Sequence, residues 1–162
     1  MKVRQAVLVV LAAAVTLTSV AAAGPHAAKQ RVAITSKVVA NTSSSGQFVL
    51  TPLQAGALKR DSGTESSVWN ERVVMREGQS VEIDEGVQTL KGLRGSVTMR
   101  FRVEYVDAGN RYVSGTGTWK VVRGTGQYAH ITGGGRSGTV SRDVPPSRGP
   151  WSSRAEGFLT LP

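Results

Sequence analysis

The chain has 162 residues, a formal net charge of +9, 19 glycines, two histidines and no cysteine. This length accommodates one domain, and the apolar fraction of 40% is that of a globular protein rather than a disordered one. The lack of cysteine excludes disulfide scaffolds, thiolate nucleophiles, iron–sulfur centres and cysteine-ligated zinc.

Residues 1–23 have the pattern of a secretory signal peptide. Lys2 and Arg4 precede an apolar stretch from Ala6 to Ala23, which ends in a small-residue cleavage signal of the A-x-A type. The alternative is an uncleaved membrane anchor, against which three hydroxyl residues inside the stretch argue. We therefore expect cleavage near Ala23, a secreted or extracytoplasmic protein, and no transmembrane segment after cleavage.

Residues 24–46 are rich in Ala, Ser and Thr and predict a flexible leader. Four aliphatic residues, Val32, Ile34, Val38 and Val39, leave open an edge strand in the same segment. We place the start of the folded domain at Gln47, so that the domain comprises residues 47–162.

From Gln47 onward the apolar residues recur with a period of two. The clearest segment is Gly95 to Tyr105, in which alternate residues are apolar and would share one face of a strand. The turn residues 107–110, DAGN, separate it from a second strand at 111–122, so the two predict a hairpin.

Other strands are shorter, and no amphipathic helix follows the signal peptide. Strands are predicted at residues 48–53, 58–60, 67–76, 79–85, 87–90, 134–140 and 155–161. Many antiparallel strands at short spacing indicate a sandwich or a barrel, and the two long neighbouring strands favour the barrel. The predicted fold class is all-β, a single antiparallel β-barrel of eight or nearly eight strands.

Glycines are densest between Gly115 and Gly138. Residues 124–129 match the G-x-G-x-x-A dinucleotide pattern, but the following HITGGG cannot sustain the helix which that site requires. A phosphate loop is rejected because its lysine is missing. The favoured interpretation is structural: glycines allow turns with positive φ, and Tyr128 anchors the reversal between two strands.

Residues 117–129, GTWKVVRGTGQYA, followed by TGGG at 132–135, resemble the signature of allene oxide cyclase-like and dirigent-like β-barrels. Residues 91–97, KGLRGSV, resemble the hairpin before a central strand of such barrels, and the chain as a whole is similar to small exported bacterial members. The signature residues carried over here shape the barrel and are Gly117, Gly124, Gly126, Tyr128, Gly133 and Gly135.

The resemblance implies a barrel that uses no cofactor and forms a homotrimer. It also implies one of two activities, cyclisation of an unstable fatty-acid epoxide or steering of phenoxy-radical coupling. The family's catalytic residues are not part of the signature, so the resemblance assigns no catalytic residue to this chain.

The sequence contains few residues in patterns that are typical of catalytic sites. His130 lies in the glycine-rich segment and is interpreted as structural or exposed rather than as a base. Asp84 and Glu85 are adjacent on a strand and so point to opposite faces. With Glu82 they form an acidic cluster that either binds a cation weakly or is a solvated strand end; the latter is favoured, and no metal site is expected.

Large apolar residues at alternating positions are the candidates for the barrel interior. They either line a ligand cavity or fill the barrel as core, and they are Trp69, Met75, Met99, Phe101, Tyr105 and Trp119. Because Glu104 alternates with Tyr105, only one of the two can face the interior.

Three functions follow as hypotheses. The first is an exported barrel that binds a small apolar ligand or a cell-envelope component, such as an anionic polymer attracted by the net positive charge. The second is a cofactor-free isomerase or dirigent-type enzyme acting in the lumen. The third is a structural surface module, with the homotrimer as its assembly. Nucleic acid is not an expected partner, because there is no basic run and no RNA-binding aromatic motif.

Overall fold

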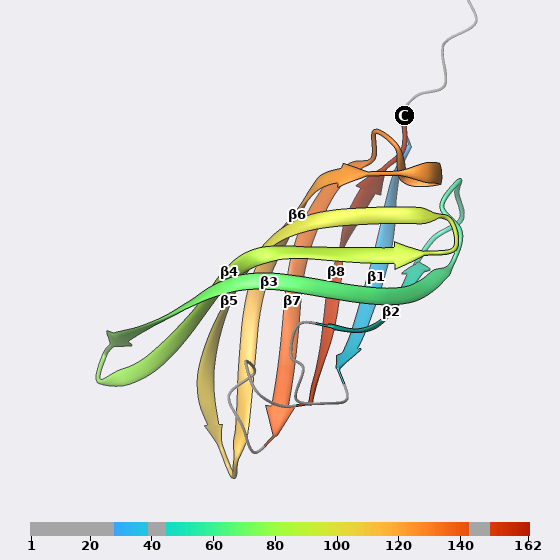
Figure 1. Ribbon diagram of the computed structural model, residues 1–162. Coiled ribbons are helices and arrows are strands. Elements are labelled where there is room, and N and C mark those ends of the chain that lie inside the picture. Colours follow the sequence, from blue (N-terminus) through green and yellow to red (C-terminus); the bar gives the residue numbers. More distant parts are fainter. Residues whose placement is uncertain (1–27, 39–44, 143–149) are drawn as a thin grey trace, which may run out of the picture.

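Eight antiparallel strands form one closed β-barrel in the computed structural model, which describes residues 28–38, 45–142 and 150–162 (Figure 1). The predicted all-β class and barrel are confirmed, and the predicted signal peptide lies outside the described residues. Strands follow one another around the barrel in chain order. They are β1 (Lys29–Val38), β2 (Ser45–Pro52), β3 (Asp61–Arg76), β4 (Gln79–Gly92), β5 (Gly95–Gly109), β6 (Tyr112–Gly124), β7 (Thr132–Arg142) and β8 (Trp151–Thr160).

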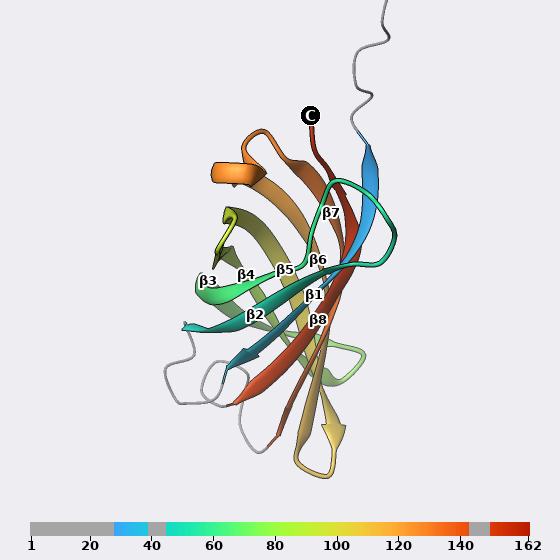
Figure 2. The same ribbon diagram turned by 90° about the vertical axis from the view of Figure 1, so that its right-hand side faces the viewer.

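Strand β1 closes the barrel, and it lies inside the segment that the sequence predicts as a flexible leader. It lies between β2 and β8 (Figure 2). Residues 32–37 pair with β2, and the whole strand pairs with β8, from Lys29 opposite Thr160 to Val38 opposite Trp151. Its aliphatic residues Val32 and Ile34 are at most 2% exposed. The leader prediction is therefore wrong for residues 29–38, because these residues satisfy two otherwise open sheet edges. The barrel starts at Lys29 rather than at Gln47, and residues 24–27 and 39–44 lie outside the described residues.

Two other predicted boundaries change. The strands expected at 79–85 and 87–90 form the single strand β4, because Gly86 continues the ladder between Trp69 and Phe101. Residues 58–60 form no strand. Leu58 is instead buried in the core, and its backbone N–H donates to Gln30 Oε1 over 2.9 Å.

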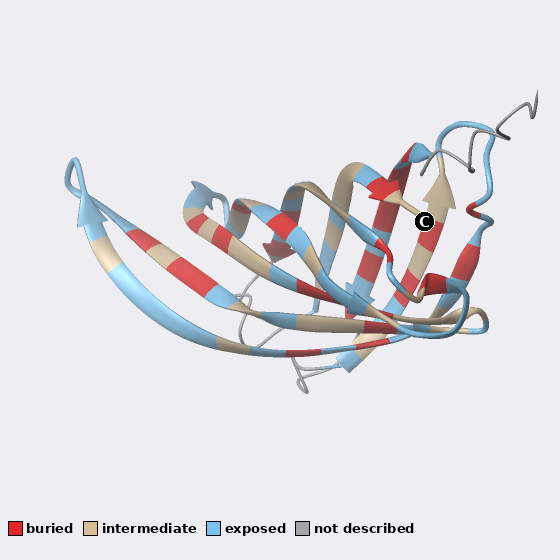
Figure 3. Cartoon of the chain, turned by 90° about the horizontal axis from the view of Figure 1, so that it is seen from above, coloured by how far each residue is buried: buried red, intermediate tan, exposed pale blue. Residues whose placement is uncertain are grey.

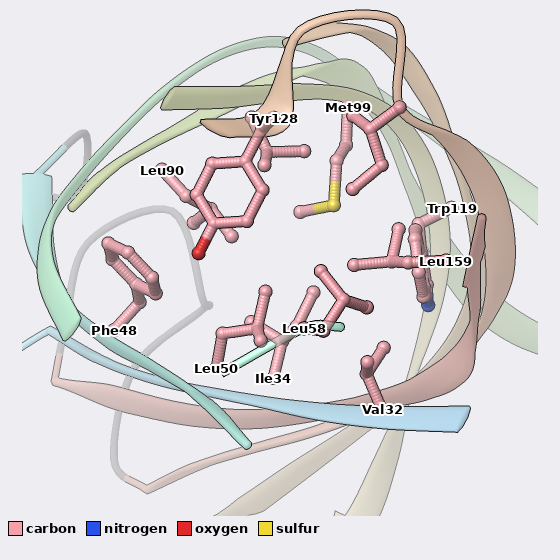
Figure 4. Packing of buried hydrophobic residues seen from close by; sticks show 12 residues of the cluster. Val32, Ile34, Phe48, Leu50, Leu58, Leu90, Met99, Trp119, Tyr128 and Leu159 are labelled. Atoms are coloured by element: carbon pink, nitrogen blue, oxygen red, sulfur yellow. The ribbon is translucent and has the colours of Figure 1, made fainter. Parts of the chain in front are cut away.

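Apolar side chains fill one end of the barrel. Figure 4 shows them converging from the surrounding strands toward the barrel interior. Full burial of one such side chain contributes about 1.5–3 kcal/mol to folding. The cluster consists of Val32, Ile34, Phe48, Leu50, Leu58, Leu90, Val97, Met99, Trp119, Tyr128, Ile131 and Leu159.

The glycine-rich segment covers this end as a tight reversal that contains one 3-10 turn, η1 (Gly126–Tyr128). Gly126 has φ +62°, a conformation that favours glycine. At Gly124 a Cβ would collide with the Tyr128 carbonyl, so no other residue fits there. Tyr128 is buried in the core, as the structural interpretation expects, whereas His130 is exposed.

A buried carboxylate, Asp61, ties this reversal to the barrel. The Tyr128 hydroxyl donates to Asp61 Oδ2 over 2.9 Å. The backbone N–H groups of Leu93 and Arg94, in the β4–β5 turn, donate to the same carboxylate over 3.1 and 3.2 Å, and that of Ser62 donates over 2.9 Å. Burial, and then the bond to Asp61, raise the pKa of Tyr128. Asp61 thus connects the start of β3, the β4–β5 turn and η1.

Candidate functional site

The other end of the barrel is hollow. It contains a cavity of about 70 Å³, so the lumen is filled at one end and has free space at the other. Side chains from seven strands line it, namely Ile34, Ser36, Ser67, Trp69, Asp84, Gln88, Met99, Phe101, Val103, Tyr105, Trp119, Ser137, Thr139, Trp151, Ser153 and Ala155.

The cavity lies where large side chains face rows of small ones. Strands β3 to β5 contribute Trp69, Met99, Phe101 and Tyr105. Strands β6 and β8 contribute one tryptophan each, but β6 to β8 also carry rows of small residues that pair in register: Gly117, Ser137 and Ala155 in one row, and Gly115, Thr139 and Ser153 in the next. Small side chains cannot fill the space that the large ones leave, so a cavity remains.

Gly115 shows how closely the two sides fit. A Cβ at this position would overlap the ring of Tyr105, which pairs with Gly115 in register. The missing side chain therefore lets the Tyr105 ring lie flat against β6.

Five of the six predicted interior residues line the cavity: Trp69, Met99, Phe101, Tyr105 and Trp119. Met75 does not, because it is 68% exposed. It has the inward parity of Trp69, but it lies near the tip of the β3–β4 hairpin, beyond the last residues that pair with β2 and β5. The hairpin extends past the other described strands (Figures 1 and 3), which agrees with the exposure of Met75.

Asp84 and Glu85 point to opposite faces, as alternation predicts. Asp84 faces the cavity and is 4% exposed, so the favoured interpretation of a solvated strand end is wrong for this residue. Glu85 faces outward and accepts from Arg72 and Arg102 over 3.1 and 2.8 Å. The cavity therefore contains a carboxyl group. The sequence predicted that Asp84 lies on a strand, but it did not predict that Asp84 is buried.

Tyr105 and Glu104 divide in the same way. Tyr105 lines the cavity, while Glu104 lies outside and pairs with Arg76 over 2.6 Å and Arg102 over 2.7 Å. Glu104 is opposite the buried Ile83 in register. Each such surface ion pair contributes little to stability.

Burial controls the titration of the interior acids. It raises the pKa of Asp84 to about 7, with the charges of Glu82 and Glu71 adding to the effect. Burial likewise raises the pKa of Glu65 to about 7, against hydrogen bonds from Ser36 and Gln88. Tyr105 has a raised pKa because it is buried and lies near Asp84.

The cavity and the outer surface differ in charge. Within the described part of the chain, Asp84 is the one charged residue of the cavity lining, and no lysine, arginine or histidine lines it. Basic residues lie outside, for example Arg100 opposite Lys120 in register, both exposed. The net positive charge of the chain therefore does not extend into the lumen.

Sequence reasoning missed Trp151 and the polar lining residues. Trp151 is the first residue of β8, four residues before the predicted start of that strand, and the proline-rich stretch before it gave no strand pattern. With Trp151 included, all three tryptophans of the chain line the cavity. Ser36 was missed because it lies in the segment interpreted as a leader.

Comparison with family models, curated proteins and solved structures finds no match. The resemblance to allene oxide cyclase-like and dirigent-like barrels therefore stays a prediction. Among the described residues, no helix has the length and apolar character needed to cross a membrane.

Proposed function

We propose that the protein binds a small, mainly apolar molecule in the barrel cavity, with a hydrogen-bond-donating or positively charged group of that molecule directed at Asp84. The observation that carries this proposal is the cavity itself, whose lining, as far as the structure describes it, combines an aromatic wall with one buried carboxyl group and no base. Cavities lined by apolar residues and a few placed polar groups are the usual form of small-molecule sites.

The aromatic wall supports an apolar or aromatic ligand body. Trp69, Phe101 and Trp119 face the same space as Met99. Aromatic rings bind apolar surface and also attract cations to their faces. The volume of about 70 Å³ is roughly half that of an engineered cavity that accepts benzene, so the ligand is small or inserts one end through the open side.

The polar groups support selection by charge. A carboxylate ligand would approach Asp84 without a neutralising partner, because no base lines the described cavity. An amine or alcohol would instead donate to the Asp84 carboxylate. The proposed ligand class is therefore neutral or cationic, in contrast to the anionic molecules that the outer surface attracts.

The test uses the three tryptophans, since all of them line the cavity. Their indole N–H signals in ¹⁵N NMR spectra are expected to shift saturably with benzylamine and benzyl alcohol, and not with the matched anion benzoate. Ala155→Phe, which places a ring in the cavity, is expected to weaken benzylamine binding at least tenfold. Val140→Phe, on the outside of the neighbouring strand, is the control and should bind like the wild type. Equal shifts with benzoate, or undiminished binding by Ala155→Phe, would contradict the proposal.

A second candidate function is cofactor-free steering of a reaction inside the lumen. It is favoured by one observation: Asp84 and Tyr105 place a carboxyl group and a phenol on the wall of the same cavity, where both can hydrogen-bond a reacting oxygen. Its test is the enantiomeric excess of the coupled product when a neutral phenol is oxidised by a one-electron oxidant in the presence of the protein. We expect an excess with the wild type and its loss with Asp84→Asn. A racemic product with the wild type would exclude this function for that phenol.

A further inference from the structure

Three carboxyl groups gather on the inner face of the β3–β4 hairpin. Glu71 on β3 lies directly opposite Asp84 on β4, and Glu82 precedes Asp84 by two residues on the same face. One oxygen from each of the three lies within 4.8 Å of the other two. Like charges directly opposite each other in a sheet are destabilising, so this arrangement works against the fold unless something neutralises it.

Two oxygens of this group are buried and have no hydrogen-bond partner among the residues that the structure describes. Asp84 is 4% exposed, and its Oδ1 accepts no hydrogen bond from these residues; the same holds for Glu82 Oε1. A buried polar atom left unpaired costs about 1–3 kcal/mol, and more when it is charged. Asp61, the buried carboxylate at the other end of the barrel, instead accepts from four donors.

The arginines of the hairpin do not supply the missing positive charge. Arg72 pairs with Glu85, and Arg76 pairs with Glu104, both on the outer face. The inner face also offers a route from solvent, since Glu71 is exposed, Glu82 is half-buried and Asp84 is buried. A small cation can therefore reach the two unpaired oxygens.

The donor atoms indicate which cations would fit. One oxygen from each carboxylate lies within 4.8 Å of the other two, so a single ion can contact all three. Calcium accepts about six to eight oxygen ligands in flexible geometry, whereas magnesium requires near-ideal octahedral geometry. All three donors are carboxylates, which suit a hard cation rather than zinc or copper.

We propose that Glu71, Glu82 and Asp84 form a binding site for a hard divalent cation such as Ca²⁺, with water completing its coordination. The sequence offered Glu82, Asp84 and Glu85 as a cluster. The structure replaces Glu85 by Glu71, which only the pairing of β3 with β4 brings close.

The test uses Tb³⁺, which substitutes for Ca²⁺ and emits when a nearby aromatic residue is excited. Trp69 lies two residues from Glu71 on the same face, and Tyr105 lies opposite Glu82 in register. We expect saturable Tb³⁺ emission that Ca²⁺ displaces, and a rise in the thermal midpoint with added Ca²⁺. Glu71→Gln is expected to weaken binding at least tenfold, and its exposed side chain makes it compatible with folding.

Glu77→Gln is the matched control, because Glu77 is an exposed acid at the turn of the same hairpin. Absence of saturable emission with the wild type, or equal weakening by Glu77→Gln, would overturn the cation site. Because Asp84 belongs to both sites, the Tb³⁺ titration is run without benzylamine and the benzylamine titration without a divalent cation. Each result then tests one site, so failure of the cation site and failure of the ligand proposal are distinguishable.

Discussion

Replacing Asp61 with alanine is expected to lower the free energy of unfolding by about 4 kcal/mol, because four donors then lose their acceptor. Three of these donors are backbone N–H groups, two of them in the β4–β5 turn, and the fourth is the buried Tyr128 hydroxyl. The substitution removes the link that Asp61 makes between the glycine-rich reversal and the barrel wall. The measurement is urea unfolding followed by tryptophan fluorescence.

Two further variants provide a comparison for the expected loss of unfolding free energy. Tyr128→Phe removes one hydrogen bond to a charged acceptor and should cost about 1.5–3 kcal/mol. Asp107→Ala removes one exposed hydrogen bond, from the Gly109 N–H over 2.8 Å, and should cost less than about 1 kcal/mol. A loss for Asp61→Ala no larger than that for Asp107→Ala would show that Asp61 does not hold this end of the barrel together.

Stability is expected to fall as the pH rises from about 4.5 to above 7. Burial raises the pKa of Glu65 from 4.5 to about 7, so the folded protein binds a proton that the unfolded chain has released in this range. The stabilisation is fully present below pH 4.5 and is lost as the pH passes through about 7. For Glu65 alone the shift corresponds to at most about 3 kcal/mol.

Glu65→Gln isolates this contribution, because the amide oxygen still accepts from Gln88 and carries no charge. The variant should unfold at a higher temperature than the wild type above pH 7, and its stability should vary less between pH 4.5 and 8. Because the pKa of Asp84 is also raised, the stability of the variant should still decrease somewhat as the pH rises. Glu77→Gln, on the surface, should keep the wild-type profile. Identical pH profiles for Glu65→Gln and the wild type would refute the assignment.

Alternation along single strands made much of the interior predictable. The segment Gly95 to Tyr105 directs Met99, Phe101 and Tyr105 inward and Glu104 outward, as the period of two requires. That Asp84 and Glu85 point to opposite faces followed from the same rule, but which of them faces inward did not. The glycine-rich reversal with buried Tyr128 was also predictable, because the HITGGG stretch after it cannot sustain the long helix of a dinucleotide site.

Pairing between distant strands was not predictable in the same way. β1 looked like a leader because its composition is polar, and only its two neighbours show why it is ordered. Met75 has inward parity, yet the hairpin carries it past the barrel wall. Glu71 joins Asp84 only through the register of β3 and β4. A one-dimensional pattern gives the face of a residue but not its height along the barrel or its opposite neighbour.

The most direct test of the ligand proposal is a crystal structure of the protein soaked with 4-bromobenzylamine, with the bromine located by anomalous scattering. We predict a bromine peak inside the barrel among Trp69, Phe101 and Trp119, with the amine directed at Asp84. Bromine peaks confined to the outer surface, with the cavity between β3–β5 and β6–β8 unchanged, would contradict the account.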